Sequence, residues 1–421
     1  MRYITQWFEE HHLGTPLELT DSVDRYQAHS GPRINYSSNR FHAQECWIEP
    51  HALLFEENIR SVPITVSANG SFPIFFCGRG DLGFDVWAAS FYLISRYEEY
   101  LPHRLDGYGR YEFSQSLAAT NQFLHRPLID EWMMALCGCL RSYFPSLLFK
   151  SIEFQHLATY DIDESYAYRY KSLLRLLGGG LRNLLQGRLV VLATRLRTGA
   201  GLQKDPYDIY SLLPEMHPPG TDRPLFFFHV AAKWGRYDKN LSPHHPAQQK
   251  LIRSLSGLYA IGLHPSWRSG DEPSLLKSEK KVLEKLAGQP ITASRQHYIR
   301  FYLPETYARL LDAGITDDYS MGYGSVNGFR AGTSRSFFWF NLKRNEVTSL
   351  RVHPFCYMDA NSFFESGQSF NEAEAEWRGL EQSIRRVKGR MITVWHNTFL
   401  GTEKRFSGWR ERYVKWLQEQ T

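Results

Sequence analysis

The sequence Thr159-Tyr160-Asp161-Ile162-Asp163 ends an apolar run that begins near Ile152, and it decides the fold that we expect. Side chains two positions apart on a β-strand point to the same side, so Asp161 and Asp163 can face one small site at the end of that strand. Two carboxylates this close are costly unless a cation, a proton or a substrate separates their roles. The pair therefore predicts a catalytic or metal-binding site, although Asp also favours helix N-caps and could simply begin a helix near Ser165.

From residue 223 onward, short strand-like runs alternate with helical ones. We expect strands at 225–230, 259–264, 291–294, 350–356 and 391–395, and helices at 246–259, 274–287, 304–313, 372–387 and 407–418. Alternation of this kind is typical of parallel strands joined by helical crossovers, and it predicts a barrel-like α/β domain. In such barrels the chemistry lies at the C-terminal ends of the strands. Polar residues fall at those ends in this sequence: Asp161, Asp163, His264, Arg295, His297, His353 and His396.

Residues 1–150 show a different pattern and predict a small α/β domain of unknown role. Strand-like runs are expected at 46–48, 62–66 and 73–77, and amphipathic helices at 84–100 and 129–144. Residues 151–421 form the second predicted domain.

Gly78, Gly80 and Gly83 fit the G-x-G-x-x-G pattern of dinucleotide-binding loops, and they follow a strand-like run. That motif also needs an acidic residue at the end of a second strand about 20 residues later. Glu98 and Glu99 lie inside the predicted helix instead. We therefore favour a glycine-rich turn over a nucleotide site.

The composition excludes several classes of protein. The 421 residues are 43% hydrophobic, enough for two or three folded domains, and their formal net charge of +5 does not by itself indicate nucleic-acid binding. The five cysteines match no zinc-finger spacing, which favours buried free thiols in a reducing compartment. We see neither a signal peptide nor an apolar run long enough to span a membrane, so we expect a cytoplasmic protein.

A basic, leucine-rich segment at 165–204 stands apart from the rest of the chain. It holds eight Lys and Arg residues and no Asp or Glu, and three consecutive glycines at 178–180 divide it into two predicted helices. A basic amphipathic helix can lie on an anionic membrane surface. The alternative is an insertion whose leucines pack on the protein body, and we favour that interpretation while keeping peripheral membrane contact open.

The polar strand ends suit a hydrolytic metal site. Such a site holds its ion with His and Asp side chains and leaves one position for water, whose proton a nearby carboxylate can accept. Asp161 and Asp163 are spaced for these two tasks, and His264 supplies an imidazole. Arg295 could hold a carboxylate by a bidentate bond, and His396 could protonate a leaving group.

Several of these segments resemble the motifs of the NodB-homology polysaccharide deacetylases, carbohydrate esterase family 4. Residues 159–163 resemble the first motif in its D-x-D form, and 262–268 resemble the H-(S/T)-x-x-H motif. Residues 295–298 with 303–306 and 313–315 resemble the R-x-P motif and its helix, 352–354 with 358–359 the fourth motif, and 394–396 the fifth. The resemblance implies a distorted (β/α)7 barrel in which Asp161 is the catalytic base, Asp163 and His264 bind the metal, Arg295 orients the base and His396 is the general acid.

The whole chain is also similar to a Bacteroidetes-type group of polysaccharide-deacetylase-like proteins with an α/β domain in front of the barrel. The segments SRYEEYLP at 95–102, HPFCYMDA at 353–360 and WHN at 395–397 carry this likeness.

One departure from the family pattern concerns the metal. Arg268 stands where the second motif has its second histidine, and a guanidinium cannot bind a metal ion. The third motif has lost its proline but gained His297. We therefore expect a rebuilt site with His297 as the third ligand, and a divalent ion, with zinc favoured for an Asp/His/His set.

We expect a metal-dependent hydrolase that removes acetyl groups from an N- or O-acetylated carbohydrate, for example in cell-surface polysaccharide synthesis. The alternative is a non-catalytic glycan-binding or scaffold protein on a degenerate barrel, which the substitution at Arg268 motivates. A nucleotide-dependent enzyme is the third and weakest hypothesis. The residues expected to contact the carbohydrate are Trp267, Tyr298, Arg330, His353 and Asp359.

Overall fold

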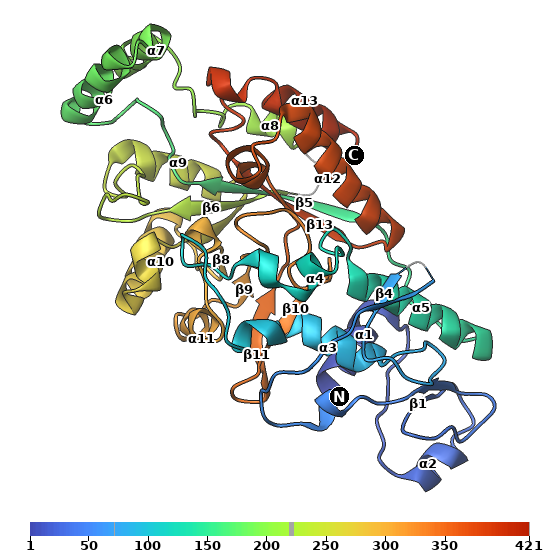
Figure 1. The fold of residues 1–421 in the computed structure, drawn as a ribbon. Coiled ribbons are helices and arrows are strands. Elements are labelled where there is room, and N and C mark those ends of the chain that lie inside the picture. Colours follow the sequence, from blue (N-terminus) through green and yellow to red (C-terminus); the bar gives the residue numbers. More distant parts are fainter. Residues whose placement is uncertain (71, 219–222, 421) are drawn as a thin grey trace.

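A large, mainly parallel sheet lies at the centre of the protein (Figure 1). The computed structural model describes residues 1–70, 72–218 and 223–420. Over these residues the sheet has the strand order β10-β11-β9-β8-β7-β6-β5-β13-β12. The strands are β5 (Gln155–Ile162), β6 (Leu225–His229), β7 (Ala260–His264), β8 (Ala293–Ser294), β9 (Asp317–Asp318), β10 (Phe337–Asn341), β11 (Glu346–Val352), β12 (Tyr357–Met358) and β13 (Arg390–His396).

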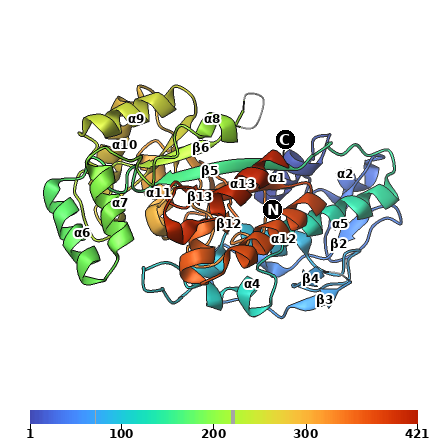
Figure 2. The same cartoon turned by 90° about the horizontal axis from the view of Figure 1, so that it is seen from above.

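Neighbouring strands run parallel except for β10 and β11, which pair antiparallel. Every residue of β6 is buried, as expected for a parallel strand covered on both faces. Helices outside the sheet include α9 (Pro246–Ser256), α10 (Pro273–Ala287), α11 (Glu305–Asp312), α12 (Phe370–Arg386) and α13 (Trp409–Gln418) (Figures 1 and 2). The predicted alternation of strands and helices in an α/β protein is thus confirmed.

A closed barrel is not confirmed, because the described strands follow an open order. The predicted strand at 350–356 is split between two places in the sheet. β11 pairs with β9, whereas β12, only a few residues later, pairs with β13. Between them, the Phe355 N–H donates to the Met321 carbonyl and the Cys356 N–H to the Ile392 carbonyl. Residues 346–358 therefore reach from one side of the sheet to the other.

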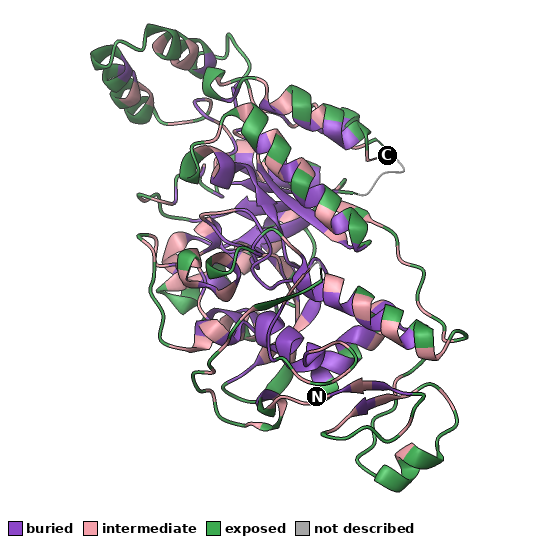
Figure 3. Ribbon diagram, turned by 45° about the vertical axis from the view of Figure 1, so that its right-hand side comes forward, coloured by how far each residue is buried: buried purple, intermediate pink, exposed green. Residues whose placement is uncertain are grey.

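The N-terminal part packs against β10. Its main helices are α1 (Arg2–His12), α3 (Val86–Ile94) and α5 (Leu128–Tyr143), and two small sheets pair β1 (Ile34–Tyr36) with β2 (Cys46–Ile48) and β3 (Ser67–Asn69) with β4 (Phe72–Ile74). The Tyr3 hydroxyl donates to the Phe338 carbonyl at 2.8 Å. Figure 3 shows buried residues continuing from the sheet into this part, and both share one hydrophobic core. The boundary expected near residue 150 stays a prediction.

The G-x-G-x-x-G stretch is a turn closed by an antiparallel bridge between Cys77 and Phe84. A Cβ atom at Gly80 would lie 2.7 Å from the Trp47 carbonyl oxygen. Close packing against a neighbouring strand thus accounts for this glycine.

The basic segment lies between β5 and β6 in the sequence. It forms a helical hairpin of α6 (Leu173–Leu185) and α7 (Leu189–Gly199) that projects from the body (Figure 1). Most of its leucines are exposed, so the favoured interpretation, in which they pack on the protein body, is wrong. The three glycines lie inside α6, where Gly179 and Gly180 face Arg195 and Leu192 of α7, and the exposed leucines lie outside this contact. Within the described part of the chain, no helix combines the length and apolar character needed to cross a membrane.

Candidate active site and metal centre

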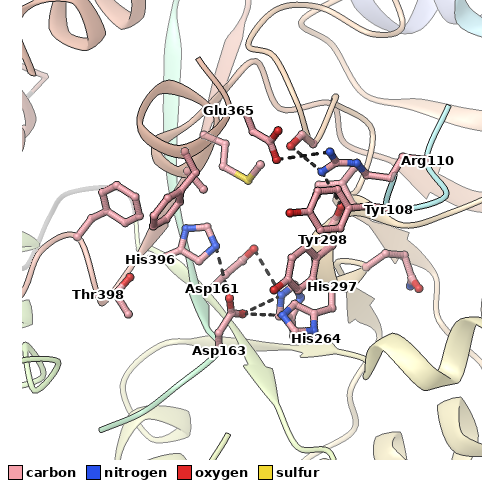
Figure 4. A pocket seen from close by; sticks show the side chains of 17 residues that line it. Tyr108, Arg110, Asp161, Asp163, His264, His297, Tyr298, Glu365, His396 and Thr398 are labelled. Carbon is pink, nitrogen blue, oxygen red and sulfur yellow. Dashed lines mark hydrogen bonds and ion pairs between the residues drawn. The ribbon is translucent and has the colours of Figure 1, made fainter. Parts of the chain in front are cut away.

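The ends of β5, β6, β7 and β13 meet at one edge of the sheet, and the sequence predicts the polar residues at three of them, Asp161, His264 and His396. Asp161 lies opposite His396 in the register of β5 and β13, and His229 lies opposite His264 in β6 and β7. Asp161, His264 and His396 face a cavity of about 490 Å³, shown in Figure 4, whereas His229 lies outside its lining. Its lining includes Asp161, Asp163, His264, His297, Tyr298 and His396 from the second part of the chain, and Tyr108 and Arg110 from the first.

Of the three groups of described residues that could hold a metal ion, the one formed by Asp163, His264 and His297 lines the cavity. The Nε2 atoms of His264 and His297 lie 3.1 Å and 3.6 Å from Asp163 Oδ1. One donor atom from each residue falls within 4.8 Å of the others. Asp163 Oδ1 is buried and, among the described residues, has no hydrogen-bond partner. A buried acceptor facing two imidazoles fits a cation held by one carboxylate and two histidines.

The pKa shifts of Asp163 and His264 agree with this arrangement. Burial raises the pKa of Asp163, but the imidazoles of His297, His264 and His396 outweigh it and hold the pKa well below its usual range. Burial lowers the pKa of His264, which favours the neutral imidazole that a metal ion requires. Burial lowers the pKa of His297, but Asp163 and Asp238 outweigh it and raise the pKa to about 9, so a bound ion would displace the proton of His297.

Arg268 stays outside the cavity. Its guanidinium lies on the surface, 2.5 Å from Glu272, on the short 3-10 helix Trp267–Gly270. The structure thus brings His297 to the cluster and leaves Arg268 away from it.

Asp161 is held by a buried arginine. Arg295 Nη1 donates to Asp161 Oδ1 at 2.8 Å, and Arg295 Nε donates to the Tyr319 carbonyl at 2.9 Å. The second carboxylate oxygen, Asp161 Oδ2, lies 3.8 Å from His264 Nε2. Asp161 therefore lies next to the metal cluster with one oxygen fixed by Arg295.

His396 is oriented by Asp359. His396 Nδ1 lies 2.6 Å from Asp359 Oδ1, and the His396 backbone N–H donates to Asp359 Oδ2 at 2.7 Å. The other ring nitrogen, Nε2, lies 3.8 Å from Asp163 Oδ2. Burial lowers the pKa of His396, but the nearby carboxylates, Asp359 first, outweigh it and raise the pKa to about 10. Asp359, expected to touch substrate, lies behind His396 and is completely buried.

Of the other residues expected to contact a carbohydrate, Tyr298 lines the cavity and Trp267 lies beside it. The Tyr298 ring stacks on Tyr108 at a centroid distance of 5.4 Å, and Trp267 stacks on Tyr237 at 4.1 Å. The four rings form one aromatic cluster.

Arg330 and His353 do not line the cavity. Arg330 is buried against Glu99, with Nη2 2.7 Å from Oε2. His353 pairs with Asp317 at 2.8 Å and stacks on Tyr319.

The sequence interpretation missed His229 and Asp238. Asp238 Oδ1 lies 3.3 Å from His297 Nδ1 and 3.3 Å from His229 Nε2, and it accepts a hydrogen bond from the Trp267 N–H at 2.8 Å. A carboxylate on the far nitrogen of a histidine fixes which nitrogen faces a metal. His229 ends β6 and lies one residue before the end of the strand predicted at 225–230, so its place near a strand end could have revealed it. Asp238 lies in a loop without any sequence pattern.

Tyr108 and Arg110 were also missed, because they belong to the part of the chain expected to fold separately. Arg110 Nη1 donates to the Gly324 carbonyl at 2.7 Å, and Arg110 Nε donates to Asp106 at 2.6 Å. These bonds fix the segment around residue 108 against the cavity, so the N-terminal part supplies one of its walls.

Comparisons with known proteins cover parts of the chain. Residues 1–145 match the model of a family described as "Family of unknown function (DUF7033)". A crystal structure from Mycobacterium smegmatis, described as a "putative polysaccharide deacetylase", is similar over 64% of this chain and 85% of that one, with 14% sequence identity and a TM-score of 0.38. No curated protein matches the chain. At so low a score and identity, this structural likeness adds no argument about function, which has to come from the site.

Proposed function

We propose that the protein is a metal-dependent hydrolase that removes acetyl groups from an N- or O-acetylated carbohydrate. One observation carries the proposal: three candidate metal ligands, a carboxylate held by arginine and a histidine held by aspartate face a single cavity. This is the set of groups that metal-assisted hydrolysis of an acyl bond needs.

Asp163, His264 and His297 would hold the ion, and zinc suits this ligand set. When bound, such an ion polarises the acetyl carbonyl and increases the acidity of water. Asp161, fixed through Oδ1 by Arg295, accepts the proton that the attacking water loses as its oxygen bonds to the acetyl carbon. His396, held through Nδ1 by Asp359, gives the proton on Nε2 to the departing amine or alcohol as the acyl bond breaks. The products are acetate and the deacetylated sugar.

The carbohydrate part of the proposal is supported by the aromatic cluster of Tyr108, Tyr237, Trp267 and Tyr298. Aromatic faces offer flat apolar surfaces on which sugar rings can stack, with polar edges left for hydroxyl groups. The motif resemblance points to the same substrate class. We further propose that the sheet belongs to a distorted (β/α)7 barrel, which residues 346–358 would close because they pair with both β9 and β13.

The test combines metal content with acetate release. Zinc-loaded protein is expected to hold about one equivalent of metal and to release acetate from acetylated chitin or xylan oligomers. His264→Ala and His297→Ala should lose the metal, whereas Asp161→Asn should keep it and lose acetate release. Arg268→Ala is the matched control, since that side chain lies on the surface beside the same loop, and it should behave as wild type.

Two results would overturn the proposal. Full activity of Asp161→Asn would remove the assigned base. Failure of the wild type to bind zinc, together with glycan binding that chelators leave unchanged, would establish the non-catalytic glycan-binding alternative.

A further inference from the structure

We propose that the hairpin of α6 and α7 binds the surface of an anionic lipid bilayer. This inference goes beyond the proposed hydrolase activity and does not depend on it. It rests on the exposed apolar face of the hairpin, on the charge of the same segment and on how firmly its base is attached.

The outer face of α6 is apolar and exposed. Its leucines recur at helical spacing, and Leu174 and Leu185 have 85% and 79% of their surface exposed. The same face holds Leu173, Leu177, Leu181 and Leu184. About half of the large hydrophobic side chains that the described chain exposes lie in residues 170–202. A contiguous apolar surface of this kind marks a contact with another body.

The opposite face of α6 is already occupied by α7. A Cβ atom at Gly180 would lie 3.3 Å from Leu192, and one at Gly179 would collide with Arg195. Small residues therefore let the two helices approach closely, and Asn183 is buried between them. In the described chain these leucines stay exposed, and the hairpin that carries them projects from the body (Figures 1 and 3).

The positive charge of the segment indicates an anionic partner. Residues 165–204 contain eight Lys and Arg residues and no acid. Among the described residues, only Lys171 of these cations forms an ion pair, with Glu164. Arg175, Arg182, Arg188 and Arg197 are exposed at the edges of the hairpin. Such a segment suits an anionic bilayer, because its leucines can enter the outer part of the acyl chains while its arginines contact the negatively charged headgroups.

A second copy of the chain fits this surface poorly. Joining two leucine faces would bring two sets of unpaired arginines together, and like charges repel. A bilayer with anionic headgroups neutralises them. The helices also have the wrong length to cross it, because the 13 residues of α6 span roughly 20 Å, less than the thickness of the hydrocarbon core. The hairpin therefore lies in the plane of the interface.

The base of the hairpin is attached firmly enough to orient the protein on such a surface. Asp205 accepts hydrogen bonds from the backbone N–H groups of Ala167, Tyr168 and Arg169 at 2.7 to 2.8 Å. Leu176 packs on the small cluster of Ala167, Tyr168 and Tyr207. Arg175 lies over the exposed ring of Trp234, 4.7 Å from its centroid. Trp234 lies four residues before Asp238, so this contact ties the hairpin to the loop that holds His297 through Asp238.

The test is co-sedimentation of the full chain with vesicles. Wild type should sediment with vesicles of phosphatidylglycerol and phosphatidylcholine in equal parts, much less with phosphatidylcholine alone, and less as salt is added. Leu177→Ser/Leu181→Ser/Leu184→Ser should lose most of the binding. Arg182→Gln/Arg188→Gln should bind at least about tenfold more weakly, since each cation near the surface adds to the attraction.

Leu148→Ser/Leu258→Ser is the matched control, because both leucines are exposed outside the hairpin, and it should bind as wild type. Thermal unfolding of every variant shows whether the fold is retained. Equal sedimentation of wild type and the triple leucine variant would overturn the proposal. So would a dimer in analytical ultracentrifugation that the leucine variant abolishes, because the second copy would then be the partner. Binding by wild type to an acidic protein column but to neither vesicle would assign the surface to a protein instead.

Discussion

Arg295 and Asp161 form a buried ion pair, in which Arg295 Nη1 lies 2.8 Å from Asp161 Oδ1 and the arginine has no solvent-exposed surface. The guanidinium lies over the rings of Phe227 and Phe355, at 4.4 Å and 5.6 Å from their centroids. These rings leave it little freedom to turn to another partner. Asp161 is thereby held in one position at the wall of the cavity.

Replacing only one partner of this pair should destabilise the protein. Arg295→Met leaves the Asp161 carboxylate buried without its cation, and breaking a buried pair on one side costs about 3–5 kcal/mol of unfolding free energy. The double variant Arg295→Met/Asp161→Asn removes both charges and should recover much of the loss. Urea denaturation of the three proteins measures this, and equal stability of the two variants would contradict the prediction.

A second buried network, Arg96, Glu99 and Arg330, should be equally sensitive. Glu99 accepts hydrogen bonds from Arg96 Nε and Arg330 Nε, both at 2.8 Å. Burial raises the pKa of Glu99, but the two guanidinium groups outweigh it and lower the pKa to about 2. Glu99→Gln leaves buried Arg330 without its anion and Arg96 with Glu98 alone, 2.7 Å away, and should lower the unfolding free energy by about 3–5 kcal/mol.

The control for that substitution is Glu56→Gln, which removes the carboxylate of an exposed pair with Arg60. Surface pairs contribute little, so urea denaturation should not distinguish this variant from wild type. If Glu99→Gln lowers the unfolding free energy no more than Glu56→Gln does, the buried network does not contribute to stability.

Asp238 should act on the metal through His297. It lies 3.3 Å from His297 Nδ1, and removing a carboxylate from the far nitrogen of a metal ligand typically costs 10–100-fold in affinity. We expect Asp238→Asn to weaken zinc binding by about that factor in competition with a chelator, while the stoichiometry at saturation is unchanged. Asp271→Asn is the control, since Asp271 is an exposed carboxylate paired with Arg300. Unchanged zinc affinity in Asp238→Asn would exclude this positioning role.

The sequence predicts the residues that end regular strands far better than those that act from loops. Asp161, His264 and His396 are polar residues directly after apolar runs, and parallel strands bring their C-terminal ends to one edge. Asp238 follows no such run, and only the folded chain brings it to His297.

Contacts between residues far apart in the sequence were equally difficult to predict from the sequence. Arg330 was expected to contact the carbohydrate, because the sequence around it does not indicate that its partner is Glu99, 231 positions away. The helix predicted at 84–100 is interrupted at Arg96, whose φ of 55° turns its side chain into that same buried network. Local periodicity carries no information about a tertiary contact that overrides it.

The exposed leucines of α6 show the same limit of prediction from sequence. Helical spacing predicts an apolar face, but it does not say what covers that face. Gly179 and Gly180 leave room for Arg195 and Leu192 of α7, and this contact between the two helices exists only when the hairpin is formed.

Asp318 should make stability depend on pH. Its carboxylate is completely buried, where it accepts hydrogen bonds from Ser320 N and Oγ at 2.9 Å and 2.8 Å and from Ser294 Oγ at 3.3 Å. Burial outweighs these bonds and raises the pKa of Asp318 from 3.8 to about 6. The folded protein therefore binds this proton more tightly than the unfolded chain does.

The sign of the effect follows from proton linkage. Below about pH 4 the carboxyl group is protonated in both states, so it does not oppose folding. As pH rises from about 4 to about 6, the unfolded chain ionises while the folded one keeps its proton, and the unfolding free energy falls by about 3 kcal/mol. Asp318→Asn cannot ionise, so the difference in unfolding free energy between variant and wild type should shift in favour of the variant by about that amount over this range. Urea denaturation at several pH values measures the shift, with Asp21→Asn as the exposed control. A difference that stays constant with pH would show that Asp318 titrates alike in the folded and unfolded protein.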